Sequence, residues 1–398
     1  MPPSQLHILH VVGARPNFMK ASPVIQGLSK HHEVRQTLVH TGQHYDAGMS
    51  DVFFRQLQMT RPDINLEVGS ATHAVQTGMI MTRLEPVIMR RKPDLVLVYG
   101  DVNSTVAAAL VCSKLLVPVG HVEAGLRSFD RTMPEEINRK LTDQVSDILF
   151  TPSEDGDENL LCEGIPRERI HLVGNVMIDT LVRLLPAASP TSILDKLGLT
   201  IDKTSQSEQE RCSPGNLGRP RRSEFFGLVT LHRPSNVDDP TVLAAIMQAL
   251  GDISASIPLL FPVHPRTLAR IHTMRPQVSN SRVRLLEPLG YIEFLALEGA
   301  ARFVITDSGG IQEETTYLGV PCLTVRKSTE RPITVKMGTN ILLGHDMDRL
   351  RTEVAAIIAG QTKRGQVPPL WDGKAAERIT DIITEKFTGD GLVPCSWE

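Results

Sequence analysis

The sequence predicts an α/β protein of two domains, each built on a doubly wound parallel β-sheet. A chain of 398 residues is longer than the roughly 100–200 residues that are typical of one domain. Short runs rich in Val, Ile and Leu alternate with longer segments whose apolar residues recur at helical spacing. This alternation is typical of βαβ units, whose crossover connections produce a doubly wound sheet.

The first half of the chain contains six apolar runs that we expect to be strands. The run at 95–99 (LVLVY) is apolar at every position, which indicates a central parallel strand buried on both faces. Two spacers, 17–30 and 105–115, have apolar residues at helical spacing and are expected to be helices. The six expected strands are 8–12, 34–40, 95–99, 117–122, 148–151 and 170–173.

A second series of apolar runs follows a break in which Pro, Ser, Thr, Gly and charged residues dominate. We therefore expect an N-terminal domain at 1–182, a linker at 183–224 and a C-terminal domain at 225–375. The expected strands of the second domain are 226–231, 259–263, 283–286, 303–306 and 322–325.

The part of the linker at 201–224 is a charged insertion with almost no apolar residues. Such a composition cannot bury enough apolar surface to fold by itself, so we interpret it as a solvated loop. Its arginines at 219, 221 and 222 are assigned to that loop rather than to an anion site.

The composition excludes several classes of protein. The 45 acidic and 42 basic residues give a net charge of -3, which provides no field to attract nucleic acid or an anionic membrane. Aromatic residues make up 4%, too few for base-stacking platforms. The five cysteines include no CxxC pair, as expected for reduced thiols. No apolar stretch is long enough to span a bilayer and no signal-peptide pattern is present, so we expect a cytoplasmic protein.

Small, polar or charged clusters follow four of the strands expected in the first domain. In a parallel sheet these strand ends share one edge, which is where α/β proteins bind ligands. The clusters are 13–20, 41–46, 100–105 and 121–127.

The first cluster is suited to an anion such as phosphate. Arg15 and Lys20 bracket the expected start of a helix, where amide N–H groups and the helix dipole also attract negative charge. Ala14 and Arg15 directly follow Gly13, so the pattern is not GxGxxG and gives no support for a nicotinamide cofactor.

Carboxyl groups gather at the same edge. Asp101 and Glu123 follow neighbouring strands, and Glu135 lies in a helix expected to begin at Pro134, one turn before Arg139. Carboxyl groups crowded in a dry site raise one another's pKa, which suits them to proton transfer at carbon. The rival use of these acids with His121 is metal binding, but no HExxH or DxD motif frames them, so we expect no metal.

The second domain offers an imidazole and a diphosphate cradle. His232 follows the strand at 226–231. After 303–306, Ser308, Gly309 and Gly310 lead into a helix whose first amides suit a diphosphate. One turn further, a carboxylate at Glu314 is placed to accept hydrogen bonds from a ribose diol. The expected ligand is a nucleoside diphosphate.

These motifs together resemble the non-hydrolysing UDP-N-acetylglucosamine 2-epimerases. The resemblance extends over about residues 8–344. In chain order, the runs that carry it are GARPNFMKASPVI, TGQHYD, VYGDVNST, GHVEAGLRSFDRTMPEEINR, TLHRPSN and TDSGGIQEE.

The resemblance implies a GT-B architecture, in which two Rossmann-like domains face a central cleft and a C-terminal helix at 376–398 returns to the first domain. It also implies a homodimer and a reversible conversion of UDP-N-acetylglucosamine to UDP-N-acetylmannosamine with no cofactor and no metal. In that family UDP is eliminated across C1–C2 to leave a 2-acetamidoglucal, and is then added back.

The same resemblance assigns roles to individual residues. The catalytic residues that it implies are Asp101, Glu123, Glu135 and His232. The substrate-binding residues are Arg15, Lys20, Arg139, Ser308, Gly309, Gly310 and Glu314. Gln43 and His44 match a second, effector-binding site of some members. The run TGQHYD lacks the Arg and Glu of the TGQHRE-like pattern, so regulation by an effector is left open.

Some departures leave alternatives open. Asn17 stands where many members of the family have an acidic residue. A relative that acts on UDP-2,3-diacetamido-glucuronate shares nearly all of these motifs, so that sugar is the alternative substrate. A GT-B glycosyltransferase is a further alternative, and the dense set of acids in the first domain favours the epimerase over it. A hydrolysing epimerase, which would release free N-acetylmannosamine and UDP, is another alternative.

Overall fold

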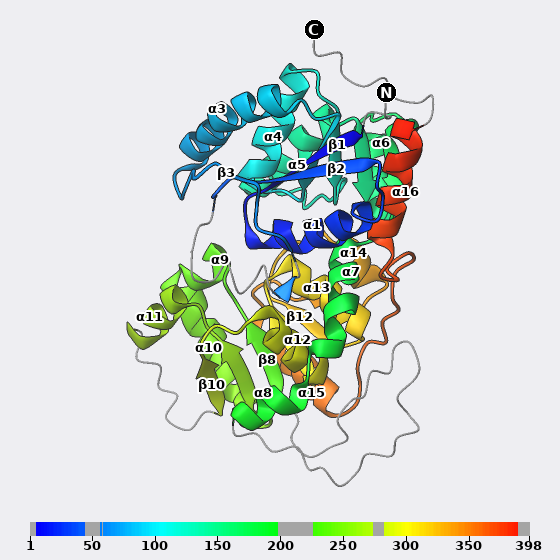
Figure 1. The fold of residues 1–398 in the computed structure, drawn as a ribbon. Coiled ribbons are helices and arrows are strands. Elements are labelled where there is room, and N and C mark those ends of the chain that lie inside the picture. The colour runs from blue at the N-terminus through cyan, green and yellow to red at the C-terminus, as the bar shows by residue number, and fades with distance from the viewer. Residues whose placement is uncertain (1–4, 44–55, 58, 198–225, 274–281, 389–398) are drawn as a thin grey trace. The chain divides into compact units, whose positions relative to one another are not determined.

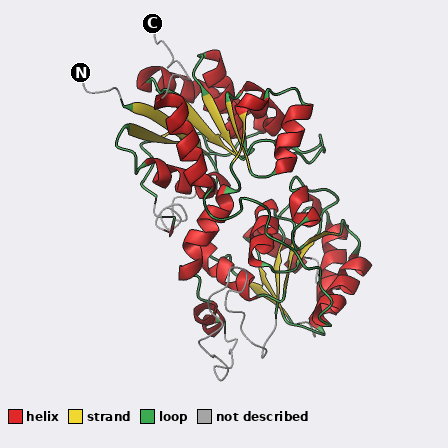
Figure 2. Ribbon diagram, turned by 90° about the vertical axis from the view of Figure 1, so that its right-hand side faces the viewer, coloured by secondary structure: helices red, strands yellow, loops and turns green. Residues whose placement is uncertain are grey.

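The structure, a computed structural model, describes residues 5–43, 56–57, 59–197, 226–273 and 282–388. The chain divides into two compact units. Unit 1 comprises Met1–Arg183 and Pro369–Glu398, and unit 2 comprises Leu184–Pro368. Each unit is a parallel sheet with helices on both faces, as Figure 2 shows, so the predicted α/β class with two doubly wound sheets is confirmed.

Unit 1 contains a seven-stranded sheet in the order β3-β2-β1-β4-β5-β6-β7, with every pairing parallel. All six expected strands are present, and the two-residue edge strand β3 is additional. The strands are β1 (Leu6–Val12), β2 (Val34–His40), β3 (Ile64–Asn65), β4 (Leu95–Tyr99), β5 (Val119–Val122), β6 (Ile148–Thr151) and β7 (Ile170–Leu172).

The helices of unit 1 cover both faces of this sheet. Helices α3, α4 and α5 lie side by side on one face, whereas α1 and α16 pack together on the other (Figure 1). The helices are α1 (Arg15–Leu28), α3 (His73–Arg91), α4 (Asn103–Lys114), α5 (Pro134–Val145), α6 (Glu154–Cys162), α7 (Val176–Leu184) and α16 (Ala375–Thr388), with a 3-10 turn at Arg167–Arg169.

Strand β4 lies at the centre of the unit 1 core. All five of its residues are buried, as expected for a parallel strand covered on both faces. It pairs with β1 on one side and β5 on the other. The residues that follow these three strands therefore come together at one edge of the sheet.

Helix α16 belongs to unit 1 although it lies at the far end of the sequence. Ile379 and Ile383 are fully buried. A Cβ on Gly27 of α1 would come within 2.7 Å of Thr380 Oγ1, so the glycine permits the two helices to approach closely. The Trp371 indole N–H donates to the Pro152 carbonyl at 2.9 Å and anchors the segment before the helix.

Unit 2 contains a six-stranded parallel sheet in the order β10-β9-β8-β11-β12-β13. The five strands expected here are present, and the edge strand β13 is additional. The strands are β8 (Gly227–Thr230), β9 (Leu259–Pro262), β10 (Val283–Leu286), β11 (Phe303–Thr306), β12 (Cys322–Thr324) and β13 (Asn340–Leu342).

Unit 2 has eight described α-helices, and the first of them precedes the sheet. Helix α8 packs against α12 and contributes buried Ile193 and Leu194 to the core. The helices are α8 (Pro190–Lys196), α9 (Pro234–Val237), α10 (Pro240–Ser254), α11 (Pro265–Thr273), α12 (Tyr291–Ala300), α13 (Gly309–Leu318), α14 (Pro332–Lys336) and α15 (Met347–Ile358), with a 3-10 turn at Leu185–Ala187.

The chain passes between the two units at two places, and both differ from the expected domain boundaries. The predicted linker began at residue 183, but the chain enters unit 2 at Leu184 and already forms α8 within the expected linker. The predicted second domain ran to 375, but the chain is back in unit 1 from Pro369. The charged insertion at 201–224 lies outside the described residues. Within the described ranges, every helix is too short or too polar to cross a membrane.

Candidate active site

The edge formed by the ends of β1, β4 and β5 gathers the predicted polar residues of unit 1. Arg15 is exposed and is the first residue of α1, directly after β1. Asp101 is half-buried and follows β4, and Glu123 is buried and follows β5. The adjacency of the three strands brings these residues to one edge, as the sequence predicts.

Lys20 and Glu123 form a buried ion pair. The Lys20 ammonium donates to Glu123 Oε2, and both residues are only 5% exposed. Gly100 keeps the space open, since a Cβ there would come within 2.6 Å of Lys20 Nζ. Lys20 was expected among the phosphate ligands, but its ammonium lies against a carboxylate predicted to be catalytic.

The backbone of Glu123 adopts a left-handed conformation, with φ of 72°. This conformation costs a residue with a side chain about 1 kcal/mol or more. Such strain is common in residues that a fold holds in place for function. The buried pair with Lys20 fixes the side chain in that position.

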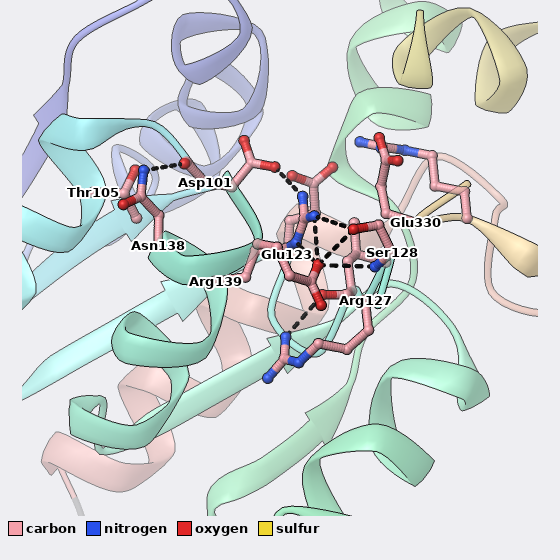
Figure 3. A network of polar contacts seen from close by, with 12 residues as sticks. Asp101, Thr105, Glu123, Arg127, Ser128, Asn138, Arg139 and Glu330 are labelled. Carbon is pink, nitrogen blue, oxygen red and sulfur yellow. Dashed lines mark hydrogen bonds and ion pairs between the residues drawn. The ribbon is translucent and has the colours of Figure 1, made fainter. Parts of the chain in front are cut away.

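Arg139 of α5 joins Asp101 to a second carboxylate (Figure 3). Arg139 Nη1 lies 2.5 Å from Asp101 Oδ2, and Nη2 lies 2.7 Å from Glu136 Oε2. The sequence predicts that Arg139 shares a helix face with Glu135, four residues before it, and α5 contains both residues. The ion-pair partner of Arg139 is nevertheless Glu136, three residues before it, which helical spacing also allows.

Glu136 is fully buried and holds the loop that precedes α5. Its carboxylate accepts hydrogen bonds from Ser128 N and Ser128 Oγ, both at 2.9 Å, and from Phe129 N at 3.1 Å. Burial by itself would raise the pKa of Glu136, but the bonds from Arg139 and Ser128 outweigh it and keep the pKa below its ordinary value. A buried carboxylate therefore orients the Arg139 guanidinium.

Glu135 lies next to this network but does not take part in it. Its side chain is half-buried, and it makes no hydrogen bond or ion pair with another residue in the described ranges. It begins the first turn of α5 directly after Pro134. Its carboxyl group is therefore available to a ligand.

His121 lies beneath the acids in a buried chain of charges. Its Nδ1 is 2.6 Å from Asp143 Oδ1, and its Nε2 is 2.8 Å from the Gly100 carbonyl. Arg127 Nη1 lies 2.7 Å from Asp143 Oδ2 and also pairs with Glu163 at 2.6 Å. Both ring nitrogens of His121 are engaged, so a role as a metal ligand would break one of these bonds. Asp143 holds His121, and His121 in turn supports the main chain at Gly100, beside Asp101.

Asn17 shapes the turn between β1 and α1. Its Oδ1 accepts from the amides of Gly13 and Ala14, both at 3.0 Å, and its Nδ2 donates to the Tyr99 carbonyl at 2.7 Å. A carboxylate at this position could not bond to the Tyr99 carbonyl, because it has no N–H to donate. The amide thus ties the first turn to strand β4.

Gln43 is engaged with the start of α4. Its Oε1 accepts from Ser104 N at 3.1 Å and from Ser104 Oγ at 2.7 Å. Gln76 Nε2 donates to the Gln43 carbonyl at 3.3 Å. His44, predicted with Gln43 as part of an effector site, lies outside the described residues.

In unit 2, Asp307 organises the segment that carries His232. This buried carboxylate accepts from the backbone amides of His232, at 3.1 Å, and Arg233, at 3.0 Å, and from Asn236 Nδ2 at 2.9 Å. His232 Nδ1 also lies 3.2 Å from Asp307 Oδ1. The imidazole is 56% exposed, so its other nitrogen is accessible to a ligand.

The predicted diphosphate cradle is the start of α13. Ser308 is its N-cap and makes no side-chain capping bond within the described part of the chain, so the first-turn amides can bind an anion. A Cβ on Gly309 would come within 2.4 Å of Arg331 Nη1 and 2.7 Å of Glu330 Oε1, so a larger residue here would displace this ion pair. Arg331 therefore lies against the same turn.

Glu314 is on the first turns of α13 and is only 2% exposed. Its Oε1 accepts from the Tyr291 hydroxyl at 2.7 Å. Burial raises the pKa of Glu314 to about 6, an effect that hydrogen bonds from Tyr291 and Glu298 partly offset. Glu298 is a second, fully buried carboxyl group beside it.

Sequence reasoning missed Glu136, Asp307, Glu298 and Arg331. Asp307 directly follows the predicted strand at 303–306, and this position was a usable signal. The others carried no local signal. Their importance depends on contacts that only the folded chain creates, such as the approach of Arg331 to Gly309.

The chain is similar over nearly its whole length to proteins of one family. A family model described as UDP-N-acetylglucosamine 2-epimerase matches residues 26–384. The UDP-N-acetylglucosamine 2-epimerase of Methanocaldococcus jannaschii is 40% identical over 381 residues, which cover 94% of this chain and 98% of that protein. The UDP-2,3-diacetamido-2,3-dideoxy-D-glucuronate 2-epimerase of Pseudomonas aeruginosa is 40% identical over 384 residues, which cover 96% and 100%.

A solved structure is similar over nearly the whole chain. The Methanocaldococcus jannaschii UDP-GlcNAc 2-epimerase in complex with UDP-GlcNAc and UDP superimposes with a TM-score of 0.82 at 40% identity. The match covers 95% of this chain and 99% of that chain. The expected GT-B architecture agrees with this similarity.

Proposed function

Because the chain belongs to the UDP-N-acetylglucosamine 2-epimerase family, we propose that it inverts C2 of UDP-N-acetylglucosamine reversibly to give UDP-N-acetylmannosamine. The observation that carries the proposal is the set of carboxyl groups at one sheet edge of unit 1. Asp101 and Glu123 follow adjacent strands, and Glu135 lies in the first turn of α5. Inversion at carbon needs proton transfer on two faces, and this set offers more than one group for it.

We assign the nucleotide to unit 2. The amides that follow Ser308 at the start of α13 suit the diphosphate, and the Glu314 carboxylate suits the ribose diol. His232, held by Asp307, presents its free imidazole nitrogen to the diphosphate. Arg15, exposed at the start of α1, keeps its predicted role as a substrate-binding cation of unit 1.

The proposed reaction proceeds by elimination and addition. A carboxylate removes the C2 proton while the C1–O bond to UDP breaks, and the C–H electron pair becomes the C1–C2 double bond of a 2-acetamidoglucal. A protonated carboxyl group then returns a proton to the opposite face of C2 as a UDP oxygen adds to C1. We assign proton transfer to Asp101, Glu123 and Glu135. Arg139 orients Asp101.

The test is incubation with UDP-N-acetylglucosamine in D2O, followed by NMR. The expected result is deuterium at C2 and the appearance of UDP-N-acetylmannosamine with its glycosidic phosphate intact. Release of free N-acetylmannosamine and UDP without the UDP-linked product would identify a hydrolysing enzyme instead. Unchanged substrate would contradict the assignment of this substrate.

A second candidate substrate is UDP-2,3-diacetamido-2,3-dideoxy-glucuronate. The similarity to the Pseudomonas aeruginosa enzyme, 40% over the full length of that protein, supports it as strongly as the comparison with Methanocaldococcus jannaschii supports the first. The same experiment with both sugar nucleotides compares their kcat/KM values. If only the glucuronate is turned over, the proposed reaction at C2 stands and its substrate is the glucuronate.

A further inference from the structure

Three amide side chains form a line of hydrogen bonds that begins in α3 and ends at Asp101. Gln76 lies in the first turn of α3, Asn103 is the first residue of α4, and Asn138 lies in α5. Gln76 and Asn103 are buried, and Asn138 is half-buried. We call these three residues the amide relay, and none of them is among the site residues that the sequence predicts.

The far end of the amide relay is fixed by two main-chain carbonyl groups. Gln76 Nε2 donates to the Gly69 carbonyl at 2.9 Å and to the Gln43 carbonyl at 3.3 Å. A carbonyl oxygen can only accept a hydrogen bond, so the atom that faces both carbonyls is the amide nitrogen. The Gln76 side-chain oxygen therefore faces the other way, toward Asn103.

The orientation of Gln76 determines the orientation of the next two amides. Asn103 Nδ2 donates to Gln76 Oε1 at 2.9 Å and lies 3.1 Å from His73 Nδ1. Asn103 Oδ1 is then the atom that accepts from Asn138 Nδ2, at 3.2 Å. The same nitrogen of Asn138 donates to the Asp101 carbonyl at 2.9 Å (Figure 3). Both hydrogens of the Asn138 amide are thus used, and neither can be given up without breaking the relay.

Helix α5 holds Asp101 at two points. Asn138 binds the main-chain carbonyl of Asp101, and the next residue, Arg139, pairs with the Asp101 carboxylate. Asp101 follows Gly100, which has φ of 62° and restrains the backbone less than any other residue would. The position of the Asp101 carboxylate therefore depends on the groups that hold its main chain from outside.

We propose that Gln76, Asn103 and Asn138 are positioning residues for the reaction at C2: the amide relay fixes the main chain of Asp101 and so places its carboxylate for proton transfer. The inference rests on the proposed function, in which Asp101 takes part in proton transfer. A displacement of about 1 Å at a reacting group can cost about 100-fold in rate. The loss of one neutral hydrogen bond in the relay is expected to cost less.

The first measurement is steady-state kinetics of the full chain with UDP-N-acetylglucosamine, or with the glucuronate if only that is turned over. Asn138→Leu should lower kcat about tenfold, Asn103→Leu about fivefold and Gln76→Met about threefold. KM should stay within about twofold of wild type, because the nucleotide is assigned to unit 2. Gln26→Met is the matched control, since Gln26 of α1 also donates to a main-chain carbonyl, that of Leu57, but lies outside the relay. It should match wild type.

Three further readouts separate positioning from a merely structural role. The number of UDP sites per chain, measured by titration calorimetry, should equal that of wild type in every variant. The double variant of Asn103→Leu and Asn138→Leu should be no slower than Asn138→Leu alone, because Asn103 acts through Asn138. In an Asp101→Asn background, Asn138→Leu should lower the remaining rate of C2 deuterium incorporation by less than about twofold.

The outcomes distinguish this inference from the proposed function. If wild type turns over neither sugar nucleotide, or if Asp101→Asn is as fast as wild type, the role of Asp101 fails and the inference fails with it. If wild type is active and Asp101→Asn is slow, relay variants as fast as Gln26→Met overturn the inference alone. Relay variants whose lower rates match a loss of UDP sites, or whose effects multiply in the double variant, also overturn it alone.

Discussion

Glu123 combines three constraints that rarely meet in one residue. Its backbone is left-handed, its side chain is buried, and its carboxylate pairs with Lys20. A glycine would accept the backbone more easily but would leave the Lys20 ammonium buried without its partner. Glutamate is therefore favoured over glycine at this position by its side chain, which agrees with a functional role for the carboxylate.

The first prediction concerns the carboxylates assigned to proton transfer. Asp101→Asn and Glu123→Gln should each slow turnover at least about 100-fold, because an amide cannot accept or donate the proton. The measurement is the rate of C2 deuterium incorporation together with circular dichroism to show that the fold persists. Glu168→Gln, on the exposed 3-10 turn, is the control and should match wild type. Wild-type rates in both active-site variants would remove these residues from the mechanism.

The neighbours Glu135 and Glu136 provide a second prediction. Glu136→Gln should lower the free energy of unfolding by about 2 kcal/mol, because its buried carboxylate holds Arg139 and Ser128. Glu135→Gln should change stability by less than about 0.5 kcal/mol but slow turnover. Urea denaturation and steady-state kinetics measure the two effects.

The pH dependence of the Glu136 effect has a definite sign. Its pKa is lower in the folded protein than in the unfolded chain, so its stabilising contribution is complete at neutral pH. The stability difference from Glu136→Gln should therefore shrink as the pH falls below about 4.3. A difference that does not change with pH would mean that the charge of Glu136 does not matter.

At this scale the sequence predicted which residues gather but not which of them pair. Asp101 and Glu123 were found because each directly follows an apolar run. The choice of Glu136 over Glu135 as the partner of Arg139 had no local signal, since both lie on the same helix face. The path of the loop before α5, which presents the Ser128 amide to Glu136, decided it.

Among the elements, α16 is held at its first residues by a carboxylate of α7. Asp179 of α7 accepts from the amides of Ala375, at 3.1 Å, and Ala376, at 2.6 Å, which begin the helix. Burial raises the pKa of Asp179 to about 6, although these backbone bonds oppose the shift. Ionisation of Asp179 strengthens these two bonds but buries a charge, and the raised pKa means that the cost of burial is the larger effect.

The third prediction follows from the sign of that shift. The folded pKa of Asp179 is above the unfolded value, so its contribution to stability is present at low pH and is lost as the pH rises through about 6. The free energy of unfolding of wild type relative to Asp179→Asn should be about 1–2 kcal/mol more favourable at pH 4.5 than at pH 7.5.

Tryptophan fluorescence measures it, because Trp371 is buried just before α16. Trp397 is replaced by Phe in both proteins so that the signal comes from Trp371 alone. A pH-independent difference between the two proteins would contradict the prediction.

The central strands of each sheet were more predictable than the edge strands. Strands at the centre of each sheet are continuous apolar runs, and all were found. The missed strands, β3 and β13, are edge strands of two and three residues, too short for any periodicity. The start of α5 at Pro134 was also predictable, because proline suits the first helical position.

On the scale of the whole molecule, the two units use the chain differently. Unit 2 is one continuous segment, whereas unit 1 needs both Met1–Arg183 and Pro369–Glu398. Two domains were predictable from length and from the two series of strands. The point of return at Pro369 was not, because its contacts join residues far apart in sequence, such as Trp371 and Pro152.

The fourth prediction tests this division. Deletion of residues 369–398 should destabilise unit 1 selectively, because it removes the buried Ile379 and Ile383 from α1. Hydrogen–deuterium exchange should show β1 and β4 losing protection by at least about tenfold. Peptides from β8 and β11 should exchange as they do in the full chain. An equal loss of protection in both units would contradict the prediction that unit 2 is stable independently of unit 1.

The return of α16 to α1 also has a consequence for synthesis. The first unit to leave the ribosome is the last to be completed, because its final helix is translated after all of unit 2. At about 5–20 residues per second, the face of α1 that α16 covers waits roughly 20–70 s for its partner, because about 350 residues separate the two helices. During that interval unit 2 can finish folding while unit 1 remains a client for the chaperones that protect nascent chains.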